Sequence, residues 1–190
     1  MEAFEQIIGQ LLEEDKFWVR HELKVILTED EKKQIGKDTI PAIGIDIVAM
    51  DVVNNTIYLL EVKNFLNSNG VDSKKIMVEY EKQEGRYKFL TCTHYRNIIT
   101  ERLRKQLQES GHIKDKITIS YGLIVSAVAP KHEILLDKYF KDKGWFFWGQ
   151  TIVRDKIKKL ADNKYENKVA TVVSKILFPI TKEYIVSKEK

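Results

Sequence analysis

Two apolar segments, each interrupted by charge, constrain this chain most. Residues 43–53 and 56–66 are rich in Ile, Val and Leu, which favour strands. The Asn54-Asn55 pair between them suits a tight turn, because Asn tolerates a positive φ. The sequence therefore predicts an antiparallel hairpin that carries Asp46 in its first strand and both Glu61 and Lys63 in its second.

Charges inside apolar strands need partners. Residues two apart in a strand share a face, so Glu61 and Lys63 are expected to point the same way. A charge placed among Ile, Val and Leu is costly unless it is paired or bound to a metal. Carboxylate oxygens suit Mg²⁺ or Mn²⁺, and a neighbouring ammonium offsets charge that develops on a phosphoryl group. The pattern predicts a divalent-metal site built from Asp46, Glu61 and Lys63.

Two simpler interpretations compete with this prediction. Glu61 and Lys63 also fit an edge-strand salt bridge that faces water. Asp51 competes with Asp46 for the place of the first carboxylate, although its position beside the turn is more simply that of a solvated hairpin residue.

The remaining periodicity predicts an α/β protein with the order α-β-β-β-α-β-α-β-α-α and a single domain over residues 1–190. We expect a core over about 1–130 and a C-terminal strand and helical extension over about 131–190. Apolar spacing predicts the following elements: helix 2–15, strand 16–27, a loop or extended hairpin connection over 28–41, mostly helix over 72–111 with a break near Gly85 or around 91–93 as the alternative, strand 117–128, helix 132–143, an aromatic strand within 144–149, and helices 151–164 and 165–177.

Several function classes lack support in the sequence. The 4 histidines form no H-E-x-x-H pattern or Cys/His cluster, and P-loops, dinucleotide-binding glycine patterns and serine nucleophile elbows are missing. The opening residues do not resemble a secretion signal, and no apolar stretch approaches the ~20 residues of a membrane helix. We expect a cytoplasmic protein without a membrane partner. The net charge of +4 permits an anionic partner without requiring one.

Asp46, fourteen intervening residues and then Glu61-Val62-Lys63 resemble the D…(D/E)xK signature of the PD-(D/E)xK, or restriction-endonuclease-like, nuclease superfamily. Ile45 stands in place of the name-giving Pro, which is a frequent substitution. The surrounding pattern is most similar to archaeal Holliday-junction resolvases and Mrr-like endonucleases. The resemblance covers about the first two-thirds of the chain and implies an αβββαβ core with a mixed central sheet flanked by helices.

The resemblance also implies a function. It indicates a Mg²⁺- or Mn²⁺-dependent endonuclease that hydrolyses nucleic-acid phosphodiester bonds, with DNA as the substrate of most relatives and a homodimer as a common assembly. The implied metal ligands are Asp46, Glu61, the backbone carbonyl of Val62, and Glu5 on the first helix. The spacing of Gln83 and Tyr87 resembles a Q-x-x-x-Y motif of the RecB-like branch, which makes Gln83 a candidate catalytic residue.

Other interpretations stay open for the surrounding residues. Glu5 is also favourable for the helix dipole without any metal. Basic residues expected to follow a nucleic-acid backbone, or equally to be ordinary surface, are Arg86, Lys88, Arg96, Arg102 and Arg104. Residues 145–148 are aromatic and are expected to fill a core, with base stacking by an exposed Trp as the alternative. Two rival functions are an inactive nuclease-like binding module and an assembly subunit that uses its aromatic strand and C-terminal helices as an interface.

Overall fold

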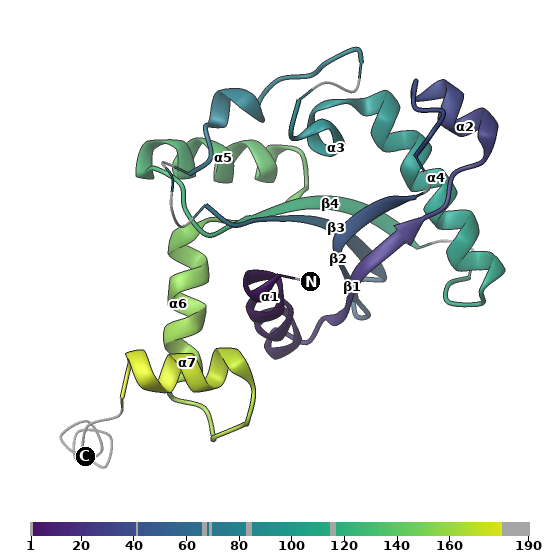
Figure 1. Cartoon of the computed structure of the whole chain (residues 1–190). Helices are drawn as coiled ribbons and strands as arrows, with labels where there is room; N and C mark the ends of the chain where they lie inside the picture. The colour runs from purple at the N-terminus through teal and green to yellow at the C-terminus, as the bar shows by residue number, and fades with distance from the viewer. Residues whose placement is uncertain are drawn as a thin grey trace.

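The computed structural model describes residues 2–40, 42–65, 68, 70–82, 85–114 and 117–179. In these ranges the chain forms an α/β fold around one mixed five-stranded sheet with the order β1-β2-β3-β4-β5 (Figure 1). The first three strands are antiparallel neighbours, whereas β4 and β5 are added in parallel. The strand bounds are β1 Trp18–Val25, β2 Ile43–Asp51, β3 Thr56–Lys63, β4 Thr118–Val125 and β5 Phe146–Trp148.

Helices cover both faces of this sheet. One apolar cluster packs α1 with α6 and α7 against one face, and another packs α3 and α4 against the opposite face (Figure 1). A third cluster joins α5 to β4 and β5. None of the helices in the described ranges is long and apolar enough to cross a membrane. The helix bounds are α1 Ala3–Glu14, α2 Glu29–Gln34, η1 Ser73–Lys75, α3 Lys88–Thr91, α4 Thr93–Glu109, α5 Pro130–Asp142, α6 Gln150–Leu160 and α7 Val169–Leu177.

The predicted hairpin is confirmed. Asp51 and Thr56 are the last paired residues of β2 and β3, and Asn55 in the turn has a φ of 48°. The Asp51 carboxylate accepts hydrogen bonds from the backbone N–H of Asn54 at 3.0 Å and from its side-chain amide at 2.6 Å. Asp51 is therefore a turn-stabilising residue, as its simpler interpretation held.

The pairing of β1 with β2 contains a local distortion beside Asp46. Ile45 packs into the cluster around α4, whereas Ile47 packs into the cluster around α1. Two residues this far apart in a regular strand would share a face. Glu22 on β1 has a φ of 51°, and the paired residues Leu23↔Ile45 and His21↔Ile47 flank this point. The side chains of β2 exchange faces there, next to the first candidate carboxylate.

Two predictions about the elements need correction. Residues 28–41 were expected to form a loop or extended hairpin connection, yet α2 begins after Thr28, whose hydroxyl accepts the N–H of Glu31 while the Glu31 carboxylate accepts the N–H of Thr28. This capping box stabilises a helix that buries none of its own residues, so no apolar period marks it. The stretch 72–111 was expected to be mostly helix, with a break near Gly85 or around 91–93. Both breaks are confirmed, because Gly85 has a φ of 73° that helices do not adopt and Cys92 separates α3 from α4, but before Lys88 the described residues of this stretch form only the short η1.

Candidate metal and nucleic-acid site

The antiparallel ladder between β2 and β3 ends where the candidate site begins. The last pair on this side is Ile47↔Leu60. Beyond it, the Asp46 side chain replaces the ladder, and its Oδ2 accepts the backbone N–H of Val62 at 2.9 Å. A buried backbone N–H needs an acceptor, so this carboxylate lets the strands separate without leaving the Val62 N–H unpaired.

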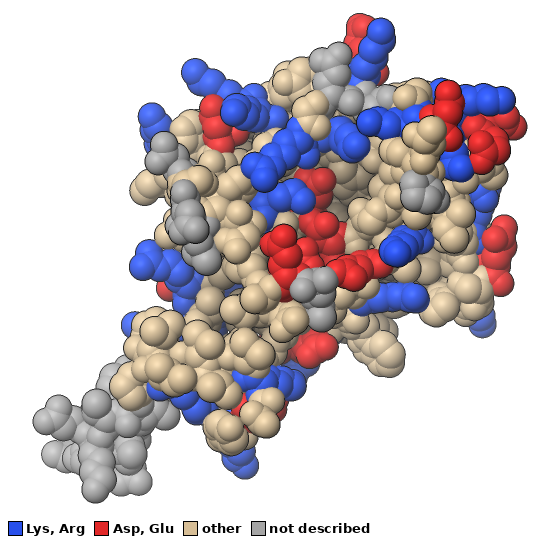
Figure 2. Space-filling model, viewed as in Figure 1, with Lys and Arg blue, Asp and Glu red and all other residues tan. Residues whose placement is uncertain are grey.

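A cavity of about 250 Å³ lies at this separation. Its charged lining consists of Asp46, Glu61 and Lys88. Figure 2 shows acidic side chains around a hollow in the centre of this face, with Lys and Arg side chains along its upper border. The apolar and aromatic part of the lining comes from Ile40, Ala42, Ile43, Gly44, Ile45, Leu60, Phe89 and Tyr95.

Lys63 pairs with Asp46 across the two strands. Its Nζ donates to Asp46 Oδ2 at 3.0 Å, and the two side chains are 22% and 27% exposed. Burial alone would lower the pKa of Lys63, but the negative charges of Glu61 and Asp46 outweigh it and raise the pKa. Lys63 is thus held as an ammonium by its pairing with Asp46 and by the negative charge of Glu61.

Glu61 is the unsatisfied member of the group. Its Oε2 is buried and has no hydrogen-bond partner among the described residues. Burial raises the pKa of Glu61 to about 7, against the attraction of Lys63 and with the repulsion of Asp46 added. A carboxylate that is costly to ionise and lacks a donor is a favourable place for a cation.

Lys88 and Tyr95 line the same cavity. Tyr95 was not among the candidate residues predicted from the sequence. The Lys88 Nζ lies 5.1 Å from the centre of the Tyr95 ring. Burial, followed by repulsion from Lys37, lowers the pKa of Lys88, although Glu61 opposes that change. Burial and the nearby Glu61 raise the pKa of Tyr95 to about 12. No spacing in the sequence marks Tyr95, because it reaches the cavity from α4 on a different part of the chain.

Glu5 is not among the residues that line this cavity. Glu5 lies in the first turn of α1, and its Oε2 accepts the backbone N–H of Glu2 at 3.2 Å, as expected for a helix cap. Within the described ranges, no three His, Cys, Asp or Glu side chains converge to hold a metal ion. Gln83 lies outside the described residues.

The basic residues separate into two groups. Lys88 lines the cavity, and Arg86 lies 5.1 Å from the Phe65 ring centre beside it. Arg96 is only 5% exposed, so the expectation that it follows a nucleic acid on the surface is contradicted by its burial. Its guanidinium donates to the carbonyls of Phe89 and Leu90, which ties α3 to α4.

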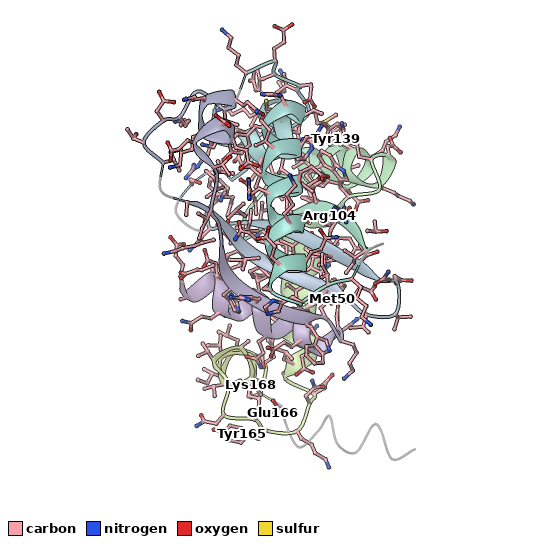
Figure 3. The ribbon with its side chains drawn as sticks, turned by 90° about the vertical axis from the view of Figure 1, so that its right-hand side faces the viewer. Met50, Arg104, Tyr139, Tyr165, Glu166 and Lys168 are labelled. Carbon is pink, nitrogen blue, oxygen red and sulfur yellow. The ribbon has the colours of Figure 1, made fainter. Side chains whose placement is uncertain are left out.

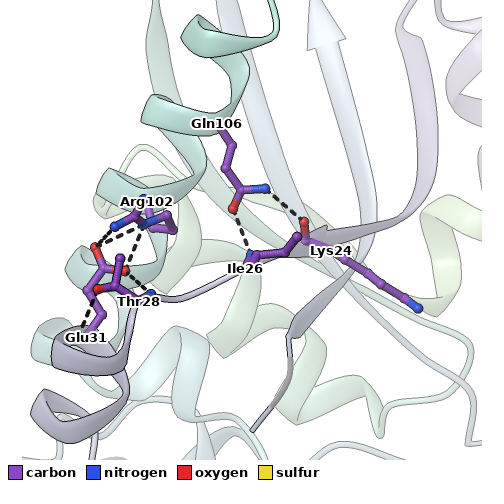
Figure 4. Close-up of polar contacts among 6 residues, drawn as sticks. All are labelled: Lys24, Ile26, Thr28, Glu31, Arg102 and Gln106. Atoms are coloured by element: carbon purple, nitrogen blue, oxygen red, sulfur yellow. Dashed lines mark hydrogen bonds and ion pairs between the residues drawn. The ribbon is translucent and has the colours of Figure 1, made fainter.

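Arg102 and Arg104 also bond within the protein. Arg102 forms a two-point ion pair with Glu31 at 2.8 Å, and this pair holds α2 against α4 (Figure 4). Gln106 on the same helix accepts the backbone N–H of Ile26, just after β1, and donates to the carbonyl of Lys24 at the end of β1, so α4 contacts the chain on both sides of Thr28 (Figure 4). Arg104 donates to the carbonyl of Ile117, and Figure 3 shows it on α4 above the sheet.

The aromatic segment mainly fills the interior. Phe147 and Trp148 are 9% and 6% exposed, and Phe147 stacks on Phe140 with ring centres 5.2 Å apart. The half-buried Trp145 packs against Tyr121 and lies 4.8 Å from the Arg96 guanidinium. The core interpretation of this segment is confirmed.

Comparisons with known proteins give little further guidance. The chain matches no protein-family model and no curated protein. One solved structure, described as a crystal structure of the protein of unknown function AF1548, is 13% identical over 98% of this chain and 95% of its own, with a TM-score of 0.42. The class of the protein comes from its own sheet and helices: it is an α/β protein with a mixed five-stranded sheet flanked by helices.

Proposed function

We propose that this chain is a metal-dependent nuclease that hydrolyses phosphodiester bonds of nucleic acids, with Asp46, Glu61 and Lys63 at its centre. One observation carries the proposal. The end of the β2–β3 ladder brings all three charges together, and Glu61 Oε2 stays buried without a hydrogen bond from the described residues. A purely structural ion pair would leave no such unsatisfied carboxylate.

The residues present fit a divalent cation. Asp46 and Glu61 supply oxygen atoms of the kind that Mg²⁺ or Mn²⁺ prefers, with the Val62 carbonyl as the further ligand that the family resemblance implies. Bound there, the cation supplies Lewis acidity toward a phosphoryl group. It would also relieve the cost of ionising Glu61, whose pKa burial raises to about 7.

Two ammonium groups of the chain act on the substrate in this proposal. Lys63, held by Asp46, offsets negative charge that develops on phosphoryl oxygens. Lys88 borders the same cavity and draws an anionic strand toward the carboxylates, which would otherwise repel it. The apolar lining, including Phe89, limits the water around these charges and strengthens their interactions.

The proposal extends to the finer fold class and the biological setting. A restriction-endonuclease-like αβββαβ core is supported by a helix followed by an antiparallel three-stranded unit with the parallel β4 added to it. α2 is a departure from that order, because it interrupts the connection between β1 and β2. We further propose DNA as the nucleic acid and a homodimer, as the resemblance implies, together with a cytoplasmic location.

The test is cleavage of labelled linear, branched and single-stranded DNAs and RNAs with Mg²⁺ or Mn²⁺. Wild-type protein is expected to cut at least one of them, and EDTA or the Glu61→Ala/Lys63→Ala variant is expected to abolish the cutting. A matched control is Asp137→Ala/Lys138→Ala, which removes an adjacent exposed pair on α5. Cutting that persists in the Glu61→Ala/Lys63→Ala variant, or no cutting of any substrate, contradicts the proposal.

A nucleic-acid binding module without chemistry is the second candidate function. It is favoured by the ion pair between Asp46 and Lys63, which satisfies Asp46 without a metal. Calorimetry separates the two candidates. The nuclease proposal requires Mg²⁺ or Mn²⁺ binding that Glu61→Gln weakens, whereas the binding module requires nucleic-acid affinity that does not change with either metal.

A further inference from the structure

A second cavity, of about 310 Å³, lies beside the candidate site and has a different lining. Phe65, Tyr80 and Tyr87 give it aromatic walls, and Lys75 and Arg86 give it two cations. Asp72 also lines it, and its carboxylate caps η1 by accepting the backbone N–H of Lys74 at 3.0 Å. Aromatic faces with guanidinium and ammonium groups are the features that proteins use to hold unpaired nucleotides. We call this cavity the Tyr80 pocket.

The Tyr80 pocket and the carboxylate cavity share a wall. Arg86 and Tyr87 line the Tyr80 pocket, and the next residue, Lys88, lines the cavity of Asp46 and Glu61. Along β3 and its exit, Glu61 borders one cavity and Phe65 borders the other. The charge of Glu61 is felt by both Arg86 and Tyr87, so the two cavities are electrostatic neighbours.

The groups in the Tyr80 pocket are available to a ligand. Tyr80 is 37% exposed, while its backbone N–H bonds the carbonyl of Thr91 at 2.7 Å and fixes its position beside α3. Arg86 lies over the Phe65 ring, and no carboxylate in the described part of the chain forms an ion pair with it. A guanidinium without an acidic partner is suited to a phosphate.

We propose that the Tyr80 pocket holds one unpaired nucleotide of the substrate strand, next to the phosphodiester bond at Asp46 and Glu61. Its base lies against Tyr80 and Phe65, and its phosphate lies against Arg86, with Lys75 contributing from η1. A fully paired duplex cannot present a base there. The inference rests on the proposed function for the position of the scissile bond. It predicts that the preferred substrates have an unpaired segment.

The experiment measures binding in EDTA, so that affinity is read without metal-dependent cutting. Fluorescence anisotropy is recorded for a labelled blunt DNA duplex and for the same duplex extended by a short single-stranded tail. Because stacking of one base on an aromatic side chain changes affinity by about tenfold or more, wild type is expected to prefer the tailed DNA by about tenfold. Tyr80→Ala and Tyr80→Leu are expected to lose this preference, and Leu keeps apolar volume at this position.

Tyr165→Ala is the matched control. Tyr165 is 68% exposed and lies in the connection between α6 and α7. It is at the opposite end of the molecule from Tyr139, which packs against the apolar cluster containing Phe65 and Tyr87 of the pocket (Figure 3). Tyr165→Ala should keep the tenfold preference. Arg86→Gln should weaken binding of the tailed DNA more than that of the blunt duplex and reduce the salt dependence of the tailed-DNA affinity, because it removes the contact to the phosphate of the unpaired nucleotide.

Each outcome tests either the nucleotide-binding role of the Tyr80 pocket or the proposed nuclease activity. Equal binding of the two DNAs by wild type, or a preference that survives both Tyr80 substitutions, overturns the pocket inference even if metal-dependent cutting is observed. A preference that depends on Tyr80 supports the pocket inference even if no substrate is cut, and in that case it is the proposed nuclease activity that fails.

Discussion

Replacing Glu61 by Gln should make the metal-free protein more stable at neutral and alkaline pH. Burial raises the pKa of this carboxyl from its ordinary 4.5 to about 7. Since a pKa change of one corresponds to about 1.4 kcal/mol, the ionised carboxylate costs the folded state about 3 kcal/mol. Gln keeps the shape of the side chain and removes the charge.

The pH dependence has a defined sign. Below about 4.5 Glu61 is protonated in both the folded and the unfolded chain, so wild type and Glu61→Gln should have equal stability. Between 4.5 and 7 the unfolded chain loses its proton more readily, and wild type becomes progressively less stable than the variant. Above about 7 the difference should stay constant at about 3 kcal/mol.

Thermal and urea unfolding in EDTA, followed by tryptophan fluorescence, measures this difference. A gain of about 3 kcal/mol corresponds to roughly 6–12 °C in Tm for a chain of this size. Mg²⁺ should then stabilise wild type, by about 3 kcal/mol at a hundred times its Kd, and have little effect on the variant. Asp137→Asn, which neutralises an exposed carboxyl on α5, is the control. A Glu61→Gln protein no more stable than wild type at pH 8 would refute the reasoning.

Three further predictions follow from other contacts. Lys63→Met should raise the pKa of Glu61 above its wild-type value, because Lys63 lowers that pKa; NMR titration of the Glu61 side chain checks this, and an unchanged midpoint contradicts it. Arg102→Ala should destabilise the protein by about 1 kcal/mol at pH 7. Hydrogen bonds from Arg102 and Thr28 outweigh burial and lower the pKa of Glu31, so this loss, measured by urea unfolding, should disappear as the pH falls through that lowered pKa. Gly122→Ala should lower the free energy of unfolding by about 1–3 kcal/mol, because its Cβ would lie 2.7 Å from the Phe146 carbonyl oxygen. Thermal unfolding tests this prediction, with Gly44→Ala as the control because a Cβ at Gly44 would meet nothing within 4 Å.

The strands were predictable because they carry local information. The β-branched runs and the Asn54-Asn55 turn predicted the β2–β3 hairpin correctly, and the spacing of Glu61 and Lys63 placed both near Asp46. α2 was missed because it buries none of its side chains, so its stability comes from its cap and from Arg102, which lies far away in sequence.

The surroundings of the site depend on tertiary structure. Lys88 was recognised only as one of several basic residues, and nothing local distinguished it from Arg96, which became buried under Trp145 and Tyr121. Tyr95 contributes to the cavity through the packing of α4 on the sheet. Burial of a cation or an aromatic ring depends on which helix covers which strand, and one sequence does not encode that in its spacing.

The hydrogen bond from the Val62 N–H to Asp46 gives Asp46 a structural role that Glu61 does not share, although both carboxylates belong to the same motif. Asp46 completes the hydrogen bonding of the sheet, so a chain of this fold without any catalytic activity would still need it for stability. Glu61 Oε2 accepts no hydrogen bond from the described residues, and in the metal-free protein the ionised side chain destabilises the folded state. For the proposed nuclease activity, therefore, a retained Asp46 would say little in related sequences, whereas loss of the acid at position 61 would indicate a chain without that activity.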